Sequence, residues 1–139
     1  MLRIYSIEQA THTKETTLAI ISEGELATTP NTTALLEVFE EGYLIKVSGR
    51  NILELEITYS DFHQLLNQYR ERLLENAENL IRLLHIHSQQ ERYLYFEKLY
   101  PNLRGRIPQY ILASYLNISY SQLSRIRSSL SKSTKKKNS

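Results

Sequence analysis

Apolar and polar residues alternate through much of the first sixty positions, and this period of two is typical of half-buried β-strands. Glycine, proline and asparagine separate the apolar runs and supply turn conformations. The runs predicted as strands are Leu2 to Ile4, Leu18 to Ile21, Leu36 to Val38, Tyr43 to Val47 and Ile52 to Ile57. We therefore expect an antiparallel β lobe over residues 1–59.

After residue 59 the apolar spacing becomes that of an amphipathic helix. Thr58 and Asp61 form a capping pair, and the helix predicted over residues 60–87 is about 40 Å long. Its spacings of three and four form a heptad seam, interrupted by Arg70, which favours a homodimer. The alternative is a wide amphipathic helix that packs only on its own β lobe. The expected dimer contacts are Leu66, Leu73, Ala77, Leu80 and Leu84.

The last segment, residues 88–139, begins with another capping pair, Ser88 and Glu91. Between Pro108 and Leu130 its apolar residues have the spacing of a helix-turn-helix. Asn117 occupies the turn position that requires a positive φ, which asparagine tolerates better than most residues. Ser119 can then cap the second helix. The same pattern also fits an ordinary helical hairpin within a small core.

The outward side of that second helix carries serine, glutamine and arginine, which suit base edges and phosphates in a DNA major groove. The expected base contacts are Tyr120, Ser121, Gln122 and Arg125. Other residues are expected to contact phosphates, which orients the protein without reading sequence. These phosphate contacts are Arg104, Arg106, Gln109, Ser119, Arg127, Lys132, Lys135, Lys136 and Lys137.

The charge of the chain is strongly polarised, although its net value is only +2. Residues 92–139 hold ten Lys and Arg and one acid, Glu97, which gives them a charge of +9. Residues 1–91 hold seven basic and fourteen acidic side chains, a charge of −7. A basic segment around a helix-turn-helix is expected for a protein that binds the phosphate backbone of double-stranded DNA. The lysine-rich tail alone fits a solvated terminus equally well.

Several other classes of protein do not fit the composition. The chain has no cysteine, so disulfides and thiolate clusters are excluded. Spanning a membrane needs about 20 apolar residues, and no such run or signal-peptide layout is present, so we expect a cytoplasmic protein with no membrane partner. His85 and His87 are too closely spaced to share a helix face, so no metal site is expected. We find no phosphate loop or nucleophile motif, and expect neither an enzyme nor a cofactor.

The run ERYLYFEKLYPNLRGRIPQYILASYLNISYSQLSRIRSSL, from Glu91 to Leu130, resembles the C-terminal domain of Crp/Fnr-type transcription regulators in their compact Bacteroidetes-like form. KETTLAIISEGEL, from Lys14, and LELEITYSDFHQLL, from Leu53, resemble the family's cyclic-nucleotide-binding-like β roll and the start of its dimerisation helix. The resemblance implies an α+β fold with a partial antiparallel β roll, a long dimerisation helix and a helix-turn-helix domain. It also implies a sequence-specific transcription regulator that binds double-stranded DNA as a homodimer and has RNA polymerase as a further partner.

The chain departs from the family pattern in two places. The family's β roll has further strands before the point that Met1 occupies, so we expect the first part of the roll to be missing. The reason could be a truncated product, a misassigned start, or a natural short form whose open sheet edge a partner covers. Nucleotide-binding members hold the cyclic phosphate with a Gly-Glu pair and a following arginine. Here Gly24-Glu25 is followed by no arginine before Arg50, so we do not expect a response to cyclic AMP.

Two alternatives stay open from the sequence. The basic helical domain could belong to a protein-interaction module that binds an acidic partner, or whose incomplete lobe completes its sheet with another chain. The chain could also be a truncated remnant of a longer gene.

Overall fold

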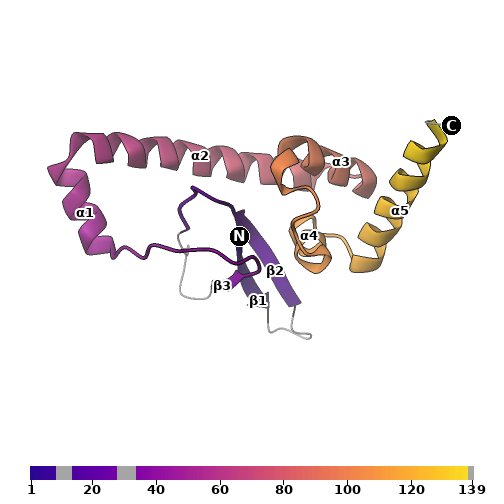
Figure 1. Ribbon diagram of the computed structural model, residues 1–139, viewed down its shortest axis with the longest axis horizontal. Helices are drawn as coiled ribbons and strands as arrows, with labels where there is room; N and C mark the ends of the chain where they lie inside the picture. The colour runs from indigo at the N-terminus through magenta and orange to yellow at the C-terminus, as the bar shows by residue number, and fades with distance from the viewer. Residues whose placement is uncertain (9–13, 28–33, 138–139) are drawn as a thin grey trace. The chain divides into compact units, whose positions relative to one another are not determined.

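The computed structural model describes residues 1–8, 14–27 and 34–137. Within these residues the protein is α+β, with a three-stranded antiparallel sheet and five α-helices, as the sequence predicts at this coarse level. The elements in chain order (Figure 1) are β1 (Leu2–Glu8), β2 (Lys14–Ile21), β3 (Leu35–Val38), α1 (Gly49–Thr58), α2 (Ser60–His85), α3 (Gln89–Leu99), the 3₁₀ helix η1 (Pro101–Leu103), α4 (Gln109–Tyr115) and α5 (Tyr120–Lys137).

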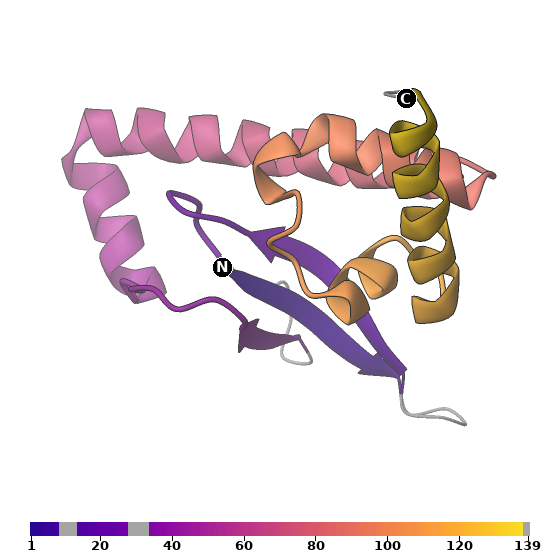
Figure 2. The same cartoon turned by 45° about the vertical axis from the view of Figure 1, so that its right-hand side comes forward.

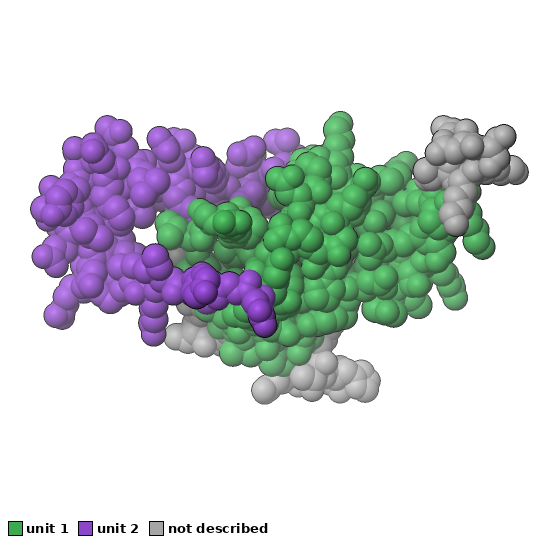
Figure 3. Space-filling model, in the orientation of Figure 1, with its two compact units in different colours: residues 1–40, 83–139 green, residues 41–82 purple. Residues whose placement is uncertain are grey.

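The chain forms two compact units, which Figure 3 shows in different colours. One unit comprises residues 1–40 and 83–139, so it holds the sheet together with α3, α4 and α5. The other comprises residues 41–82, with α1 and most of α2. The borders of these units fall after residues 40 and 82, whereas the sequence predicts domain boundaries after residues 59 and 87. A compact unit is not by itself a separately folding domain, so the expected domain organisation stays a prediction.

The sheet is built around β1, which pairs antiparallel with β2 on one side and with β3 on the other (Figure 2). Leu2 lies opposite Ile21 of β2 and Val38 of β3. Leu2 and Ile4 are each only 4% exposed, as expected of alternate residues on a central strand. The three strands predicted nearest the N-terminus are therefore confirmed. Gly24, with φ 77°, forms the turn that follows β2.

The two later predicted strands are wrong. Residues 43–47 have no regular secondary structure, and the run from Ile52 to Ile57 lies in helix α1. The side chain of Ser48 accepts a hydrogen bond from the backbone N–H of Asn51 and so caps this helix. The alternating leucines and glutamates of the run favour a helix by propensity, although they mimic the period of a strand. The antiparallel lobe is thus shorter than predicted.

Helix α3 begins where the sequence places it, and α2 begins at Ser60 as predicted, although Thr58 of the expected capping pair is the last residue of α1. The Ser88 side chain caps α3 by accepting a hydrogen bond from the backbone N–H of Glu91, at 3.3 Å. On α2 the expected dimer seam is only partly exposed, since Leu66 is 7% exposed and Leu80 is half-buried. Leu66 is thus buried within the chain, and the assignment of the five residues to a dimer seam stays a prediction. No helix in the described part of the chain is long and apolar enough to cross a membrane.

Two further apolar residues of α2 are exposed beside the expected seam. Leu74 and Ile81 are 64% and 57% exposed. With Leu73, Ala77 and Leu84, which are also exposed, they lie on one side of α2 at spacings of three and four. We call these five residues the α2 stripe.

Candidate nucleic-acid interface

The two helices of the predicted helix-turn-helix are α4 and α5, which pack against each other. On α4, Ile111, Leu112 and Ala113 are buried, and on α5 Leu123 is completely buried. The edge of the Phe96 ring on α3 meets the ring of Tyr115 at 5.8 Å between centroids, which joins α3 to this pair.

The turn between α4 and α5 is a Schellman motif. The backbone N–H of Ile118 donates to the carbonyl oxygen of Ala113 at 3.0 Å, and that of Asn117 donates to Ser114 at 3.1 Å. Asn117 has φ 50°, which confirms the prediction that this position adopts a positive φ. The motif satisfies the last carbonyls of α4 and turns the chain sharply into α5.

Helix α5 starts with a complete capping box. The hydroxyl of Ser119 accepts a hydrogen bond from the backbone N–H of Gln122 at 3.2 Å, and the Gln122 side-chain oxygen accepts one from the N–H of Ser119 at 2.8 Å. The Ser119 cap is therefore confirmed. Gln122, however, is half-buried and its oxygen is engaged in the cap, so the structure gives it a local role besides the predicted base contact.

Arg92 on α3 fixes the end of α4 through a hydrogen bond to the backbone, a role that the sequence does not predict. Its guanidinium donates to the carbonyl oxygen of Leu116, at 2.7 Å, and to that of Ile86, at 2.8 Å. Ile86 follows the end of α2, so a single side chain joins the α2–α3 junction to the residue that precedes Asn117. No local sequence pattern reveals this contact, because it spans 24 residues.

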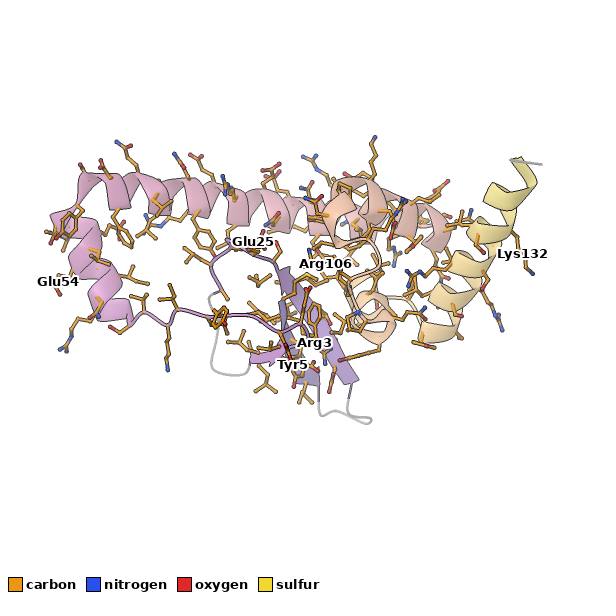
Figure 4. All side chains as sticks on the ribbon, viewed as in Figure 1. Arg3, Tyr5, Glu25, Glu54, Arg106 and Lys132 are labelled. Atoms are coloured by element: carbon orange, nitrogen blue, oxygen red, sulfur yellow. The ribbon has the colours of Figure 1, made fainter. Side chains whose placement is uncertain are left out.

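The first turns of α5 present the predicted base-reading side chains to solvent. Tyr120 is 59% exposed, and Ser121 and Arg125 are exposed one helical turn apart, on the same side. Between Tyr120 and Lys137 the sequence holds six Lys and Arg and no acid. Lys132 is exposed and points outward from α5 in Figure 4. The exposed surface of α5 thus combines hydrogen-bonding groups with positive charge.

Two of the predicted phosphate contacts are engaged within the helical domain. Arg104 pairs with Glu97, a buried carboxylate on α3, and this contact raises the pKa of the Arg104 guanidinium. Arg127 is half-buried beside Tyr93 of α3. Burial and the Glu97 carboxylate raise the pKa of the Tyr93 hydroxyl, and Arg127 opposes that rise. Arg127 therefore lies at the junction of α3 and α5, whereas Arg104 remains largely exposed.

A third predicted phosphate contact, Arg106, is paired with the segment that follows β3. Its Nη2 donates to both carboxylate oxygens of Glu40, at 2.9 and 3.0 Å. The hydrogen bond from Arg106 holds the pKa of the Glu40 carboxyl below its usual value, so Glu40 is charged near neutral pH. Arg106 therefore carries a bound carboxylate in this structure.

The remaining predicted contacts lie at helix ends. Gln109 is the first residue of α4 and is half-buried. The backbone of Lys135, Lys136 and Lys137 continues α5, so the lysine-rich tail is helical as far as Lys137. The side chains of these three lysines lie outside the described part of the chain.

The sheet packs directly on α4 in this unit. Ser114 accepts a hydrogen bond from the backbone N–H of Thr17 at 2.8 Å and donates to the carbonyl oxygen of Glu15 at 3.0 Å, so α4 covers the outer edge of β2. The Tyr110 hydroxyl donates to Glu37 of β3 at 3.0 Å. These contacts and the Arg106–Glu40 pair attach β2, β3 and the segment after β3 to α4 and the residues just before it.

A buried arginine organises the sheet beneath this contact. Arg3 is 3% exposed, and its guanidinium pairs with Glu15 and Glu37. It also lies over the rings of Tyr5 and Tyr110, at 4.2 and 5.2 Å from their centroids. Burial opposes the charge of Arg3, but the two carboxylates outweigh burial and raise its pKa. The sheet face towards α4 is therefore polar and fully paired at Arg3.

No model of a known protein family matches this sequence, and no curated protein is similar enough to count as a relative.

Proposed function

We propose that this protein is a sequence-specific DNA-binding transcription regulator of the Crp/Fnr type, in which α5 enters a major groove of double-stranded DNA. The observation that carries the proposal is the α4–α5 hairpin. A Schellman turn at Asn117 leads into a serine-capped helix that has no acidic residue and that exposes Ser121 and Arg125 on one side. An ordinary surface helix has no need to exclude acids, whereas DNA phosphates repel them.

The polar groups have different roles in this proposal. Arg125 has a planar, permanently charged guanidinium that can donate to two acceptors on one guanine, and Ser121 lies beside it on the same side of α5. Lys132 and the lysines at the end of α5 contact phosphates. Gln122 holds the first turn of α5 in place and Arg92 holds the end of α4 before it, so both act on binding through the geometry of the hairpin. The sheet belongs to a cyclic-nucleotide-binding-like β roll, and cyclic AMP is not its ligand.

The regulator acts as a homodimer through α2. The α2 stripe leaves large apolar side chains exposed at heptad-like spacings, and burying them against the same stripe of a second copy is favourable. A dimer also places two copies of α5 on one duplex, as two half-sites require. RNA polymerase is the proposed further partner of the DNA-bound dimer.

Fluorescence anisotropy with labelled duplexes, after selection of a preferred site from a random library, tests the DNA-binding proposal. If about six phosphates are contacted, affinity falls roughly a thousandfold between about 50 and 200 mM salt. Poly-glutamate is the matched control, because it offers negative charge without duplex geometry. Tight binding to poly-glutamate with no enrichment of any duplex would favour an interaction module for acidic partners instead.

A further inference from the structure

The ion pair between Arg106 and Glu40 joins two parts of the chain with different expected roles. Arg106 lies in the connection from η1 to α4, two residues before the Pro108 N-cap of α4, and Figure 4 labels it there. Glu40 lies just beyond β3 and belongs to the sheet segment of the same compact unit. Both carboxylate oxygens of Glu40 accept from one guanidinium nitrogen. Arg106 thus binds a carboxylate, and the same guanidinium is suited to bind a DNA phosphate in its place.

The rest of the sheet is attached so that Glu40 stays beside Arg106. Ser114 bonds to the edge of β2, and Tyr110 donates to Glu37 of β3, three residues before Glu40. The Glu37 carboxylate is fixed in turn by the buried Arg3. Glu40 is therefore presented by a paired strand rather than by an isolated loop. Its local concentration at Arg106 is high, because the two groups belong to one folded unit.

We propose that the sheet restrains DNA binding by presenting Glu40 to Arg106 in place of a backbone phosphate. This inference rests on the proposed DNA-binding function and concerns its regulation. When Glu40 occupies Arg106, the helix-turn-helix loses one phosphate contact and gains a nearby negative charge, which repels DNA. Any event that draws the segment after β3 away from α4 releases Arg106 and strengthens binding. The restraint is modest, since both partners are partly exposed to solvent.

The test compares single substitutions in the full chain on the selected duplex. Glu40→Gln removes the carboxylate charge and keeps the shape of the side chain. Binding is expected to tighten several-fold at low salt, and the slope of log affinity against log salt to steepen by about 0.9, the value for one added phosphate contact. Glu41→Gln is the control, because it removes the same charge from the adjacent, exposed residue. It should tighten binding by less than half as much. Thermal melting confirms that each variant is folded.

A double substitution distinguishes the ion pair between Arg106 and Glu40 from a general charge effect. With Arg106→Gln in place, Glu40→Gln should tighten binding no more than Glu41→Gln does, because the group that Glu40 occupies is gone and only the general charge effect remains. An equal gain from Glu41→Gln, or a gain from Glu40→Gln that stays undiminished beside Arg106→Gln, would overturn the inference. If Glu40→Gln bound the duplex with the same affinity as the wild type, the inference would also be overturned, while the proposed function would stand. If neither the wild type nor any variant bound duplex DNA, the proposed function and this inference would both be overturned.

Discussion

The guanidinium of Arg92 donates a hydrogen bond to the carbonyl oxygen of Leu116 at 2.7 Å, across 24 residues of chain. Leu116 is the C-cap of α4 and precedes Asn117, whose positive φ directs the chain into α5. The same guanidinium also binds the carbonyl oxygen of Ile86 after α2. The start of α5 is therefore fixed to the end of α2 by one side chain.

Replacing Arg92 should loosen this attachment. Arg92→Gln cannot reach the carbonyl oxygens of Leu116 and Ile86 together, so it should lower the free energy of unfolding by about 1 to 3 kcal/mol. Urea denaturation measures the loss. Lys98→Gln, an exposed position on the same helix, is the control and should change stability by less than about 0.5 kcal/mol. Equal effects of the two substitutions would show that the Arg92 contacts contribute nothing specific.

The backbone at Asn117 gives a second prediction. A β-branched residue is strained at φ 50°, so Asn117→Val should destabilise the protein by about 1 to 2 kcal/mol. Asn117→Gly removes the strain and should leave stability within about 0.5 kcal/mol of the wild type. Urea midpoints of the two variants give the comparison. A valine variant as stable as the glycine variant would contradict the assigned turn.

The α2 stripe predicts the oligomeric state. Leu74→Lys with Ile81→Lys places charges in the proposed seam and should convert the dimer to a monomer, with loss of most DNA affinity. Both side chains are exposed, so the isolated chain should remain folded. Gln68→Lys adds a charge on the side of α2 opposite to Ala77 and should leave the dimer intact. Sedimentation at tens of micromolar distinguishes these outcomes. A monomeric wild type would show that α2 serves only its own chain.

Cyclic nucleotides should neither bind nor stabilise. The Gly24-Glu25 pair lies in a turn where the Glu25 carboxylate accepts the backbone N–H of Ser22, and the sequence supplies no arginine before Arg50. A ligand present at a hundred times its dissociation constant would add about 2.7 kcal/mol of stability, which is visible as a raised melting temperature. An upward shift with cyclic AMP would contradict this interpretation of the lobe.

Local signals in the sequence predicted much of the fold. The caps at Ser88 and Ser119 and the turn at Asn117 depend on neighbouring residues, so their chemistry is visible in the sequence. The run from Ile52 to Ile57 was misassigned because its leucines fit a strand period and a helical face alike. The Ser48 cap is the local signal that favours the helix.

The candidate site was predicted less completely, for a physical reason. Its exposed residues, Ser121 and Arg125, follow from the helical period. The groups that restrain or position the site do not, because their partners are distant in the chain. Arg106 meets Glu40 across 66 residues, and neither residue carries a pattern that names the other. Two members of the α2 stripe, Leu74 and Ile81, were not predicted because the exposure of a residue depends on tertiary packing.

The central claim is that α5 reads base sequence through Arg125, and one pair of affinities tests it most directly. Arg125→Ala should cost about 1 to 3 kcal/mol on the selected duplex and much less on a scrambled duplex of equal length and composition, so that specificity is lost. Lys132→Ala, the matched control on the same helix, should weaken both duplexes by a similar factor. Equal losses on the two duplexes for Arg125→Ala would contradict the account and make Arg125 a phosphate contact.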